Sequence, residues 1–177
     1  MSDKILVTFA TIYGSTQEVA EAIADVLREG GAEVDLRPAS EVRTLDGYRA
    51  VVLGAPLAMH KLHKDARALL SHHRKELSQL PVAVFALGPV HDPHDEQEWQ
   101  DSRRQLDKEL AKYPWFSPLA LEMFGGKYDP ALLRFPINWL AGKEPASDLR
   151  DWTAIRAWAG SLPQSLSLQP FAASTNS

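Results

Sequence analysis

The residues best suited to chemistry form a hydroxyl-rich loop, ATIYGST, at positions 10–16. A short apolar run precedes this loop, and a segment with apolar residues at helical spacing follows it directly. A loop that leads from a strand into a helix directs backbone N–H groups and the positive end of the helix dipole toward one point, which suits an anion. Further donors are the hydroxyls of Thr11, Tyr13, Ser15 and Thr16. Because the loop contains no Lys or Arg, it predicts a phosphate site built from neutral donors.

Two common phosphate motifs are absent, and their absence narrows the ligand. The chain contains no G-x-x-x-x-G-K-[ST] motif, which disfavours a nucleoside triphosphatase, and no G-x-G-x-x-G motif, which disfavours a dinucleotide. Among nucleotide ligands, the single terminal phosphate of a mononucleotide is then the group that best fits this loop. The alternative interpretation is structural: Ser15 or Thr16 caps the start of the helix, and no ligand binds there.

The composition is that of a globular protein. Its 177 residues suffice for one domain, which we expect to span residues 1–162 and to be followed by a flexible polar tail at residues 163–177. A formal net charge of -4 disfavours nucleic acid as a partner, and the absence of cysteine excludes disulfides, thiol catalysis and cysteine-held metal clusters. No segment is typical of a signal peptide or a membrane span, so we expect a cytoplasmic location.

The rest of the chain alternates between apolar runs and amphipathic segments, which predicts alternating strands and helices. Expected strands cover residues 4–9, 33–37, 49–54, 81–87 and 117–124, and expected helices cover residues 16–29, 63–77, 95–112 and 151–162. Continuously apolar strands are typical of a parallel sheet buried on both faces, so the expected fold class is a doubly wound α/β sheet of five parallel strands in three layers. Ligands of such sheets bind at the carboxyl ends of the strands, where the loops 10–16, 55–63 and 88–94 should meet.

The second of these loops offers room for a planar ring. Gly54, Ala55 and Ala58 are small enough for a ring to approach the backbone, although an ordinary strand–helix connection explains them equally well. The third loop and the residue after it contain two histidines and two aspartates, at positions 91–95. They lack the spacing that places metal ligands on one face of a regular element, so we expect no dedicated metal site.

Three segments carry a resemblance to a known family: T-I-Y-G-S-T after the first strand, V-V-L-G-A-P-L in the third, and D-W-T-A-I-R-A-W near the C-terminus. They resemble the flavodoxin family, and within it the branch that includes menaquinone-dependent protoporphyrinogen IX dehydrogenase. The resemblance implies FMN as a noncovalent cofactor. The residues that it implies around the phosphate are Thr11, Tyr13, Gly14, Ser15 and Thr16, and Ile12 in the same loop is expected to contact the cofactor. Those that it implies along the two sides of the flavin ring are Ala55, Pro56, Leu57 and Ala58, and Leu87, Gly88, Pro89 and Val90.

The resemblance leaves three functions open. One is an FMN-dependent oxidoreductase that oxidises a substrate such as protoporphyrinogen with a quinone, the second is an electron-carrier flavodoxin, and the third is a ligand-binding module without redox activity. The partner is accordingly a quinone or a redox protein. The acidic segment 91–101 would repel the propionates of a porphyrin, so the flavin is a firmer expectation than that substrate.

An apolar segment at residues 127–142 admits two interpretations. It can rest on the inner membrane as a peripheral contact and meet a quinone, or it can cover the sheet as part of the core. We favour the core, because Lys and Arg are too sparse in this segment for strong attraction to anionic lipid.

Overall fold

A parallel sheet forms the centre of the computed structural model, which describes residues 4–58, 61–133 and 145–168. Its strands are β1 (Lys4–Phe9), β2 (Glu33–Pro38), β3 (Tyr48–Ala58), β5 (Val82–Leu87) and β6 (Ala120–Phe124), in the order β2-β1-β3-β5-β6. The order reverses at β1, so the sheet is doubly wound as predicted. A short sixth strand, β4 (Lys61–Leu62), pairs antiparallel with the end of β3, and β7 (Lys127–Tyr128) pairs with β8 (Ser147–Asp148) in a separate two-stranded sheet.

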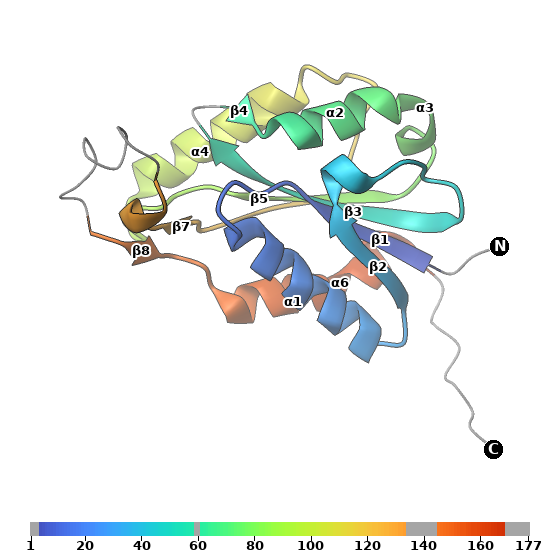
Figure 1. The fold of residues 1–177 in the computed structure, drawn as a ribbon, viewed down its shortest axis with the longest axis horizontal. Coiled ribbons are helices and arrows are strands. Elements are labelled where there is room, and N and C mark those ends of the chain that lie inside the picture. Colours follow the sequence, from blue (N-terminus) through green and yellow to red (C-terminus); the bar gives the residue numbers. More distant parts are fainter. Residues whose placement is uncertain (1–3, 59–60, 134–144, 169–177) are drawn as a thin grey trace.

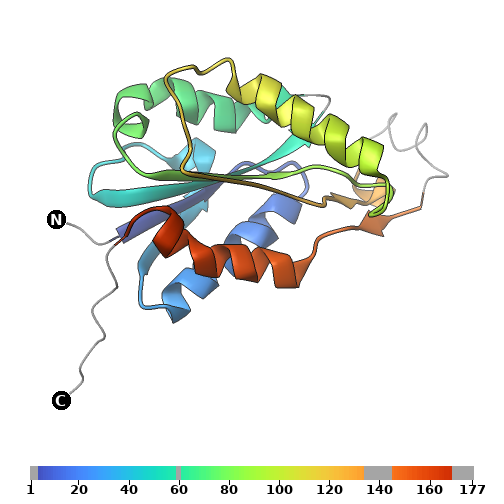
Figure 2. The ribbon, with the colours of Figure 1, turned by 180° about the vertical axis from the view of Figure 1, so that it is seen from behind.

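Helices cover both faces of the sheet and complete the predicted three layers. The helices α1 (Ser15–Glu29) and α6 (Trp152–Ser165) lie on one face, and α2 (Lys64–His72), α3 (Arg74–Leu77) and α4 (Glu96–Leu110) lie on the other, as Figure 1 shows. The view from behind in Figure 2 shows α6 alongside α1. Two short 3-10 helices, η1 (Ala39–Glu41) and η2 (Pro130–Leu132), lie in the connections.

The two cores follow from the alternation of side chains along each strand. Ile5, Val7 and Phe9 belong to the cluster that packs against α1 and α6, whereas Leu6 belongs to the cluster beneath α2 and α4. All four are buried, so both faces of β1 are covered by helices. Burial on both faces explains why the strand is continuously apolar from Ile5 to Val7.

Two elements differ from the prediction. The expected helix 63–77 is interrupted at His73, whose φ of -111° and ψ of 30° separate α2 from α3. The third strand was expected to end at Gly54, but β3 continues to Ala58, because β5 remains its neighbour as far as Pro56. Pro56 is tolerated there since β1 ends opposite Gly54, so no strand on that side needs its missing N–H. The segment expected to be a loop after Gly54 is therefore partly a strand.

The last helix is longer than predicted. It continues through Pro163 to Ser165, and Leu166 behind it is buried. Among the described residues, no helix combines the length and the apolar character needed to cross a membrane.

Glu109 is a buried carboxylate that holds β4 against α4. Its Oε2 accepts a hydrogen bond from the backbone N–H of Leu62 at 3.1 Å, and its Oε1 pairs with Lys112. Burial raises the pKa of Glu109, but the hydrogen bonds from Lys112 and Leu62 and the charge of Arg67 outweigh burial and hold the pKa below its usual value. The ionised carboxylate is therefore the form that stabilises the fold.

We expect Glu109→Gln to lower the free energy of unfolding by about 1–2 kcal/mol at neutral pH, because charge-assisted hydrogen bonds become neutral ones. The stabilisation by the wild-type carboxylate is fully present above its unfolded pKa of about 4.3, and it is lost as the pH falls through the lower folded-state value. Urea unfolding at several pH values should show the two proteins converging in acid. A gap that stays constant across that range would contradict the ionic role.

Candidate functional site

The loop between β1 and α1 turns sharply at Gly14, which has a φ of +91°. The backbone N–H of Gly14 donates to Oγ1 of Thr11 at 2.8 Å, which closes the turn. Gly14 is the N-cap residue of the helix, and within residues 4–58, 61–133 and 145–168 the first turn has no side-chain cap. Neither Ser15 nor Thr16 is therefore the N-cap of α1, so the cap assigned in the structural alternative is wrong.

The first turn of α1 contains backbone N–H groups that have no acceptor within the helix. The helical bonds begin with the N–H of Glu18, which donates to the carbonyl of Gly14 at 3.2 Å, so the three N–H groups before it have no partner within the helix. Thr16 is fully buried, and its hydroxyl has no hydrogen-bond partner among the described residues. A buried hydroxyl without a partner is costly, and an acceptor bound at this point would satisfy it.

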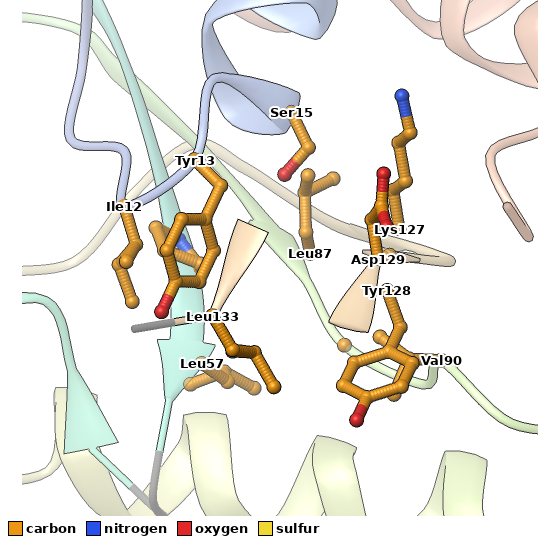
Figure 3. Close-up of a pocket in the computed structure, with 13 residues that line it drawn as sticks. Ile12, Tyr13, Ser15, Leu57, Leu87, Val90, Lys127, Tyr128, Asp129 and Leu133 are labelled. Atoms are coloured by element: carbon orange, nitrogen blue, oxygen red, sulfur yellow. The ribbon is translucent and has the colours of Figure 1, made fainter. Parts of the chain in front are cut away.

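A cavity of about 150 Å³ opens beside this helix start, at the carboxyl ends of β1, β3 and β5. Its lining residues are Ile12, Tyr13, Ser15, Pro56, Leu57, Leu87, Gly88, Val90, Gly126, Lys127, Tyr128, Asp129 and Leu133. Figure 3 shows the rings of Tyr13 and Tyr128 framing the cavity from two sides, with Ser15 at the start of α1. The lining is largely apolar, which suits a planar aromatic ligand with few charges.

The cavity brings together eight of the fourteen residues predicted around the ligand. Those eight are Ile12, Tyr13, Ser15, Pro56, Leu57, Leu87, Gly88 and Val90. Five others, Thr11, Gly14, Thr16, Ala55 and Pro89, are not among its lining residues, and the side chain of Ala58 lies outside the described part of the chain. Thr11, Gly14 and Thr16 form the adjoining helix start, Ala55 is buried in the core, and Ala58 ends β3. Pro89 is buried, and its carbonyl accepts a hydrogen bond from Gly126 at 2.7 Å.

The wall between Gly126 and Leu133 was not predicted. It is held in place by three hydrogen bonds: the Gly126 N–H donates to the Pro89 carbonyl, the Leu149 N–H donates to the Gly126 carbonyl at 2.9 Å, and the Ser147 hydroxyl donates to the Val90 carbonyl. These bonds tie the β7–β8 sheet to the third predicted loop. Strands of two residues have no periodicity, so nothing in the sequence pattern marked them. The predicted apolar segment continues into residues 134–142, which lie outside the described part of the chain.

Two cations reach the site from distant parts of the sequence, although the first loop itself contains none. Lys127 lines the cavity, and Arg150 donates a hydrogen bond to the carbonyl of Ser15 at 3.3 Å. Asp148 lies between them. Hydrogen bonds from Arg150 hold the pKa of Asp148 below its usual value against an opposing effect of burial, and the charge of Lys127 acts in the same direction. The loop itself thus contributes only neutral donors, whereas its surroundings also contain cations.

A polar groove adjoins the cavity along α4. It has a volume of about 810 Å³ and shares Leu57, Gly88 and Val90 with the cavity. Its far side is formed by charged and amide side chains of α4, among them Asp101, Arg104 and Lys108. At the start of α4, Glu98 accepts hydrogen bonds from the N–H groups of Val90 and Asp92, which fixes the loop between the two hollows. Among the described residues, no group of His, Asp and Glu is arranged to hold a metal ion.

The strand order and a cavity at the point where it reverses define a doubly wound α/β protein of the ligand-binding type. Residues 6–136 match the family model described as "Flavodoxin domain", so the chain belongs to this flavodoxin-domain family.

One curated relative and two solved structures show how far the likeness reaches. The chain is 23% identical over 150 residues to a protoporphyrinogen IX dehydrogenase [quinone] from Escherichia coli strain K12, and the match covers 71% of this chain and 83% of the relative. The fold of the present chain matches that of oxidised flavodoxin 1 from Bacillus cereus with a TM-score of 0.59 at 17% identity, and the match covers 91% of this chain and 97% of the flavodoxin.

The second structure is larger than this chain. The rubredoxin oxygen:oxidoreductase of Desulfovibrio gigas matches with a TM-score of 0.60 at 13% identity. The match covers 94% of this chain but 36% of that one, so the chain spans about a third of that protein's length. At these identities the solved structures show a shared fold.

Proposed function

We propose that this protein binds FMN noncovalently at the start of α1 and in the adjoining cavity, and that it acts in flavin-dependent oxidation and reduction. The observation that carries the proposal is a helix start without a side-chain cap, next to an apolar cavity and to the buried Thr16 hydroxyl, which has no partner in the part of the chain that the structure describes. Membership of the flavodoxin-domain family and the likeness to solved flavodoxins support the flavin.

The residues fit the two chemically different ends of FMN. The N–H groups of the first turn of α1 and the Thr16 hydroxyl would hold the phosphate, because these donors lie at the positive end of a helix dipole and have no acceptor within the helix or, for the hydroxyl, among the described residues. Leu57, Leu87 and Val90 would contact the flavin ring. A cavity of about 150 Å³ is smaller than the roughly 300–1,000 Å³ of typical ligand sites, so the ring must also use the groove that shares these walls.

We propose further that the activity is the oxidation of an organic substrate with a quinone as acceptor. When bound, FMN supplies the redox chemistry, because it can take up an electron pair from a donor and release it to a quinone. Each turnover would remove two electrons and two protons from the substrate and convert one quinone to one quinol. The E. coli relative, whose name specifies protoporphyrinogen IX and a quinone, supports this finer assignment.

The rim of the cavity also supports an apolar acceptor. Ile12 and Tyr13 are 47% and 49% exposed, and Leu132, next to the lining residue Leu133, is 48% exposed. Large apolar side chains that remain in water beside a ligand cavity are typical of a surface that meets an apolar partner. A quinone, or the membrane surface that contains it, fits this rim better than a highly charged partner.

Turnover assays would separate this proposal from a carrier role. The FMN-loaded protein should oxidise protoporphyrinogen only when a menaquinone analogue is supplied, with one quinol formed per electron pair. An electron-carrier flavodoxin would instead be reduced by a redox protein and would show no turnover with protoporphyrinogen. A protein that takes up no flavin at all would contradict both and leave the non-redox module.

Thr16→Val tests the phosphate assignment, because valine has nearly the same shape as threonine and lacks the hydroxyl. We expect FMN affinity to fall by about 1.5–3 kcal/mol, tenfold or more, because a hydrogen bond to a charged group is lost. Thr16→Ser retains the hydroxyl and should bind within a few-fold of wild type. The quenching of flavin fluorescence on titration with the apoprotein measures the FMN affinity of both variants. Equal affinities for the two would show that the Thr16 hydroxyl does not bind the phosphate.

A further inference from the structure

Arg150 is a buried cation at the start of α1, with a side chain only 4% exposed. Its Nε and Nη2 donate to the two carboxylate oxygens of Asp148, at 2.8 and 2.7 Å. Its Nη1 donates to Oε2 of Glu18 at 2.6 Å and to the carbonyl of Ser15 at 3.3 Å. The guanidinium lies 4.8 Å from the ring centre of Trp152. The polar contacts of this side chain with other described residues thus lead either to β8 or to the first turn of α1.

The acceptors on α1 belong to the helix start that would hold the phosphate. Ser15 lines the cavity, and Glu18 lies in the first turn of the helix. A carboxylate in the first turn interacts favourably with the helix dipole and so competes with an anionic ligand for the same positive end. The cluster of Arg150, Glu18 and Asp148 carries one net negative charge, and it would carry two if the arginine were neutral.

We propose that Arg150 is a positioning residue that makes the site selective for a phosphorylated flavin over an unphosphorylated one, because it neutralises Glu18 and anchors the backbone of Ser15. This inference rests on the proposed function, since FMN is the phosphorylated ligand. It goes beyond that function by assigning the selectivity to a residue 135 positions away from the loop. Its consequence is that the effect of Arg150 depends on the ligand's phosphate and on salt, whereas a purely structural tie would affect all ligands alike.

Arg150→Gln measured with FMN and riboflavin tests this directly, because the two ligands differ only in the phosphate. We expect the affinity for FMN to fall about tenfold or more, while that for riboflavin changes by less than about twofold. The loss for FMN should shrink when the ionic strength rises from about 0.05 M to about 0.5 M, because salt screens the exposed Glu18 carboxylate. Arg150→Lys, which keeps the charge, should recover part of the FMN affinity.

Glu18→Gln provides a second variant in which Arg150 keeps its paired contacts with Asp148, so the test remains if Arg150→Gln does not fold. We expect this variant to bind FMN several-fold more tightly and riboflavin unchanged, because the competing carboxylate is gone. The double variant Glu18→Gln with Arg150→Gln should bind FMN better than Arg150→Gln alone.

Two outcomes would overturn the inference alone: equal losses for FMN and riboflavin in Arg150→Gln, or an unchanged ratio of the two affinities in Glu18→Gln. A wild-type protein without any preference for FMN over riboflavin would instead contradict the proposed function. The two failures are therefore distinguishable in the same set of titrations.

Discussion

Replacing Ser15 with aspartate is expected to abolish FMN binding and to leave the fold intact. Ser15 is the first residue of α1 and lines the cavity, so a carboxylate there lies against the ligand's phosphate. Repulsion between a carboxylate and a dianion a few ångströms apart, in surroundings of intermediate dielectric, amounts to a loss of about a hundredfold or more in affinity. The same carboxylate at a helix start interacts favourably with the helix dipole. Stability and binding should thus change in opposite directions.

Ser15→Asn is the matched control, since it has nearly the size of aspartate without the charge. It should bind FMN within about tenfold of wild type, because only one neutral hydrogen-bonding group has been exchanged for another. Thermal unfolding of the apoproteins should give Ser15→Asp a melting temperature equal to or above that of Ser15→Asn. If the aspartate variant binds FMN as tightly as the asparagine variant, the phosphate does not lie at this helix start.

Gly54→Ala is expected to destabilise the sheet strongly. A Cβ at this position in β3 would stand 2.0 Å from Cζ of Phe85 in the neighbouring strand. Phe85 is fully buried, and its ring packs against those of Phe124 and Trp158 at centroid distances of 6.3 and 6.1 Å, so it has no free space into which to move. Overpacking of this kind costs about 3 kcal/mol or more where the neighbours cannot shift.

Two further variants give this prediction its controls. Gly160→Ala adds the same methyl group in α6, where nothing lies within 4 Å, and should stabilise the protein by about 0.5–1 kcal/mol. Gly54→Ala combined with Phe85→Leu shortens the clashing side chain and should recover part of the loss. Urea denaturation of all four proteins measures the differences. A Gly54→Ala protein as stable as wild type would contradict the close packing of Phe85 against Gly54 between β3 and β5.

The architecture could be predicted because its signals are local. Each parallel strand is a short, continuously apolar run, and α1 shows apolar residues at helical spacing on one face, as its buried residues Val19, Ala20, Ile23, Ala24 and Leu27 confirm. The alternation of these two patterns is sufficient to indicate a doubly wound sheet. The small errors, such as the continuation of β3 past Gly54, arise where pairing with β5 overrides the preference of proline for loops.

The candidate site could be predicted only in part, because five of its thirteen lining residues are brought to the cavity by contacts between segments far apart in the sequence. The hydroxyls and Gly14 of the loop before α1 indicate a binding loop from the sequence alone. The topology then predicts that the ends of β3 and β5 lie beside this loop. The wall formed by Lys127 and Tyr128 depends on a pairing with residues 147–148, about twenty positions later. Arginine is usually a surface residue, so the sequence gives no reason to place Arg150 at the site, and only the fold shows its hydrogen bond to Glu18.

The central claim is that a phosphate binds at the start of α1 and a flavin ring in the adjoining cavity. Backbone amide chemical shifts of the nitrogen-15-labelled chain, recorded during titration with FMN and separately with riboflavin, test it most directly. We predict that FMN moves the signals of Ser15, Thr16 and Gln17 together with those of Gly88 and Val90, and that riboflavin moves only the latter two. Saturation with FMN that leaves residues 15–17 unmoved would contradict the claim.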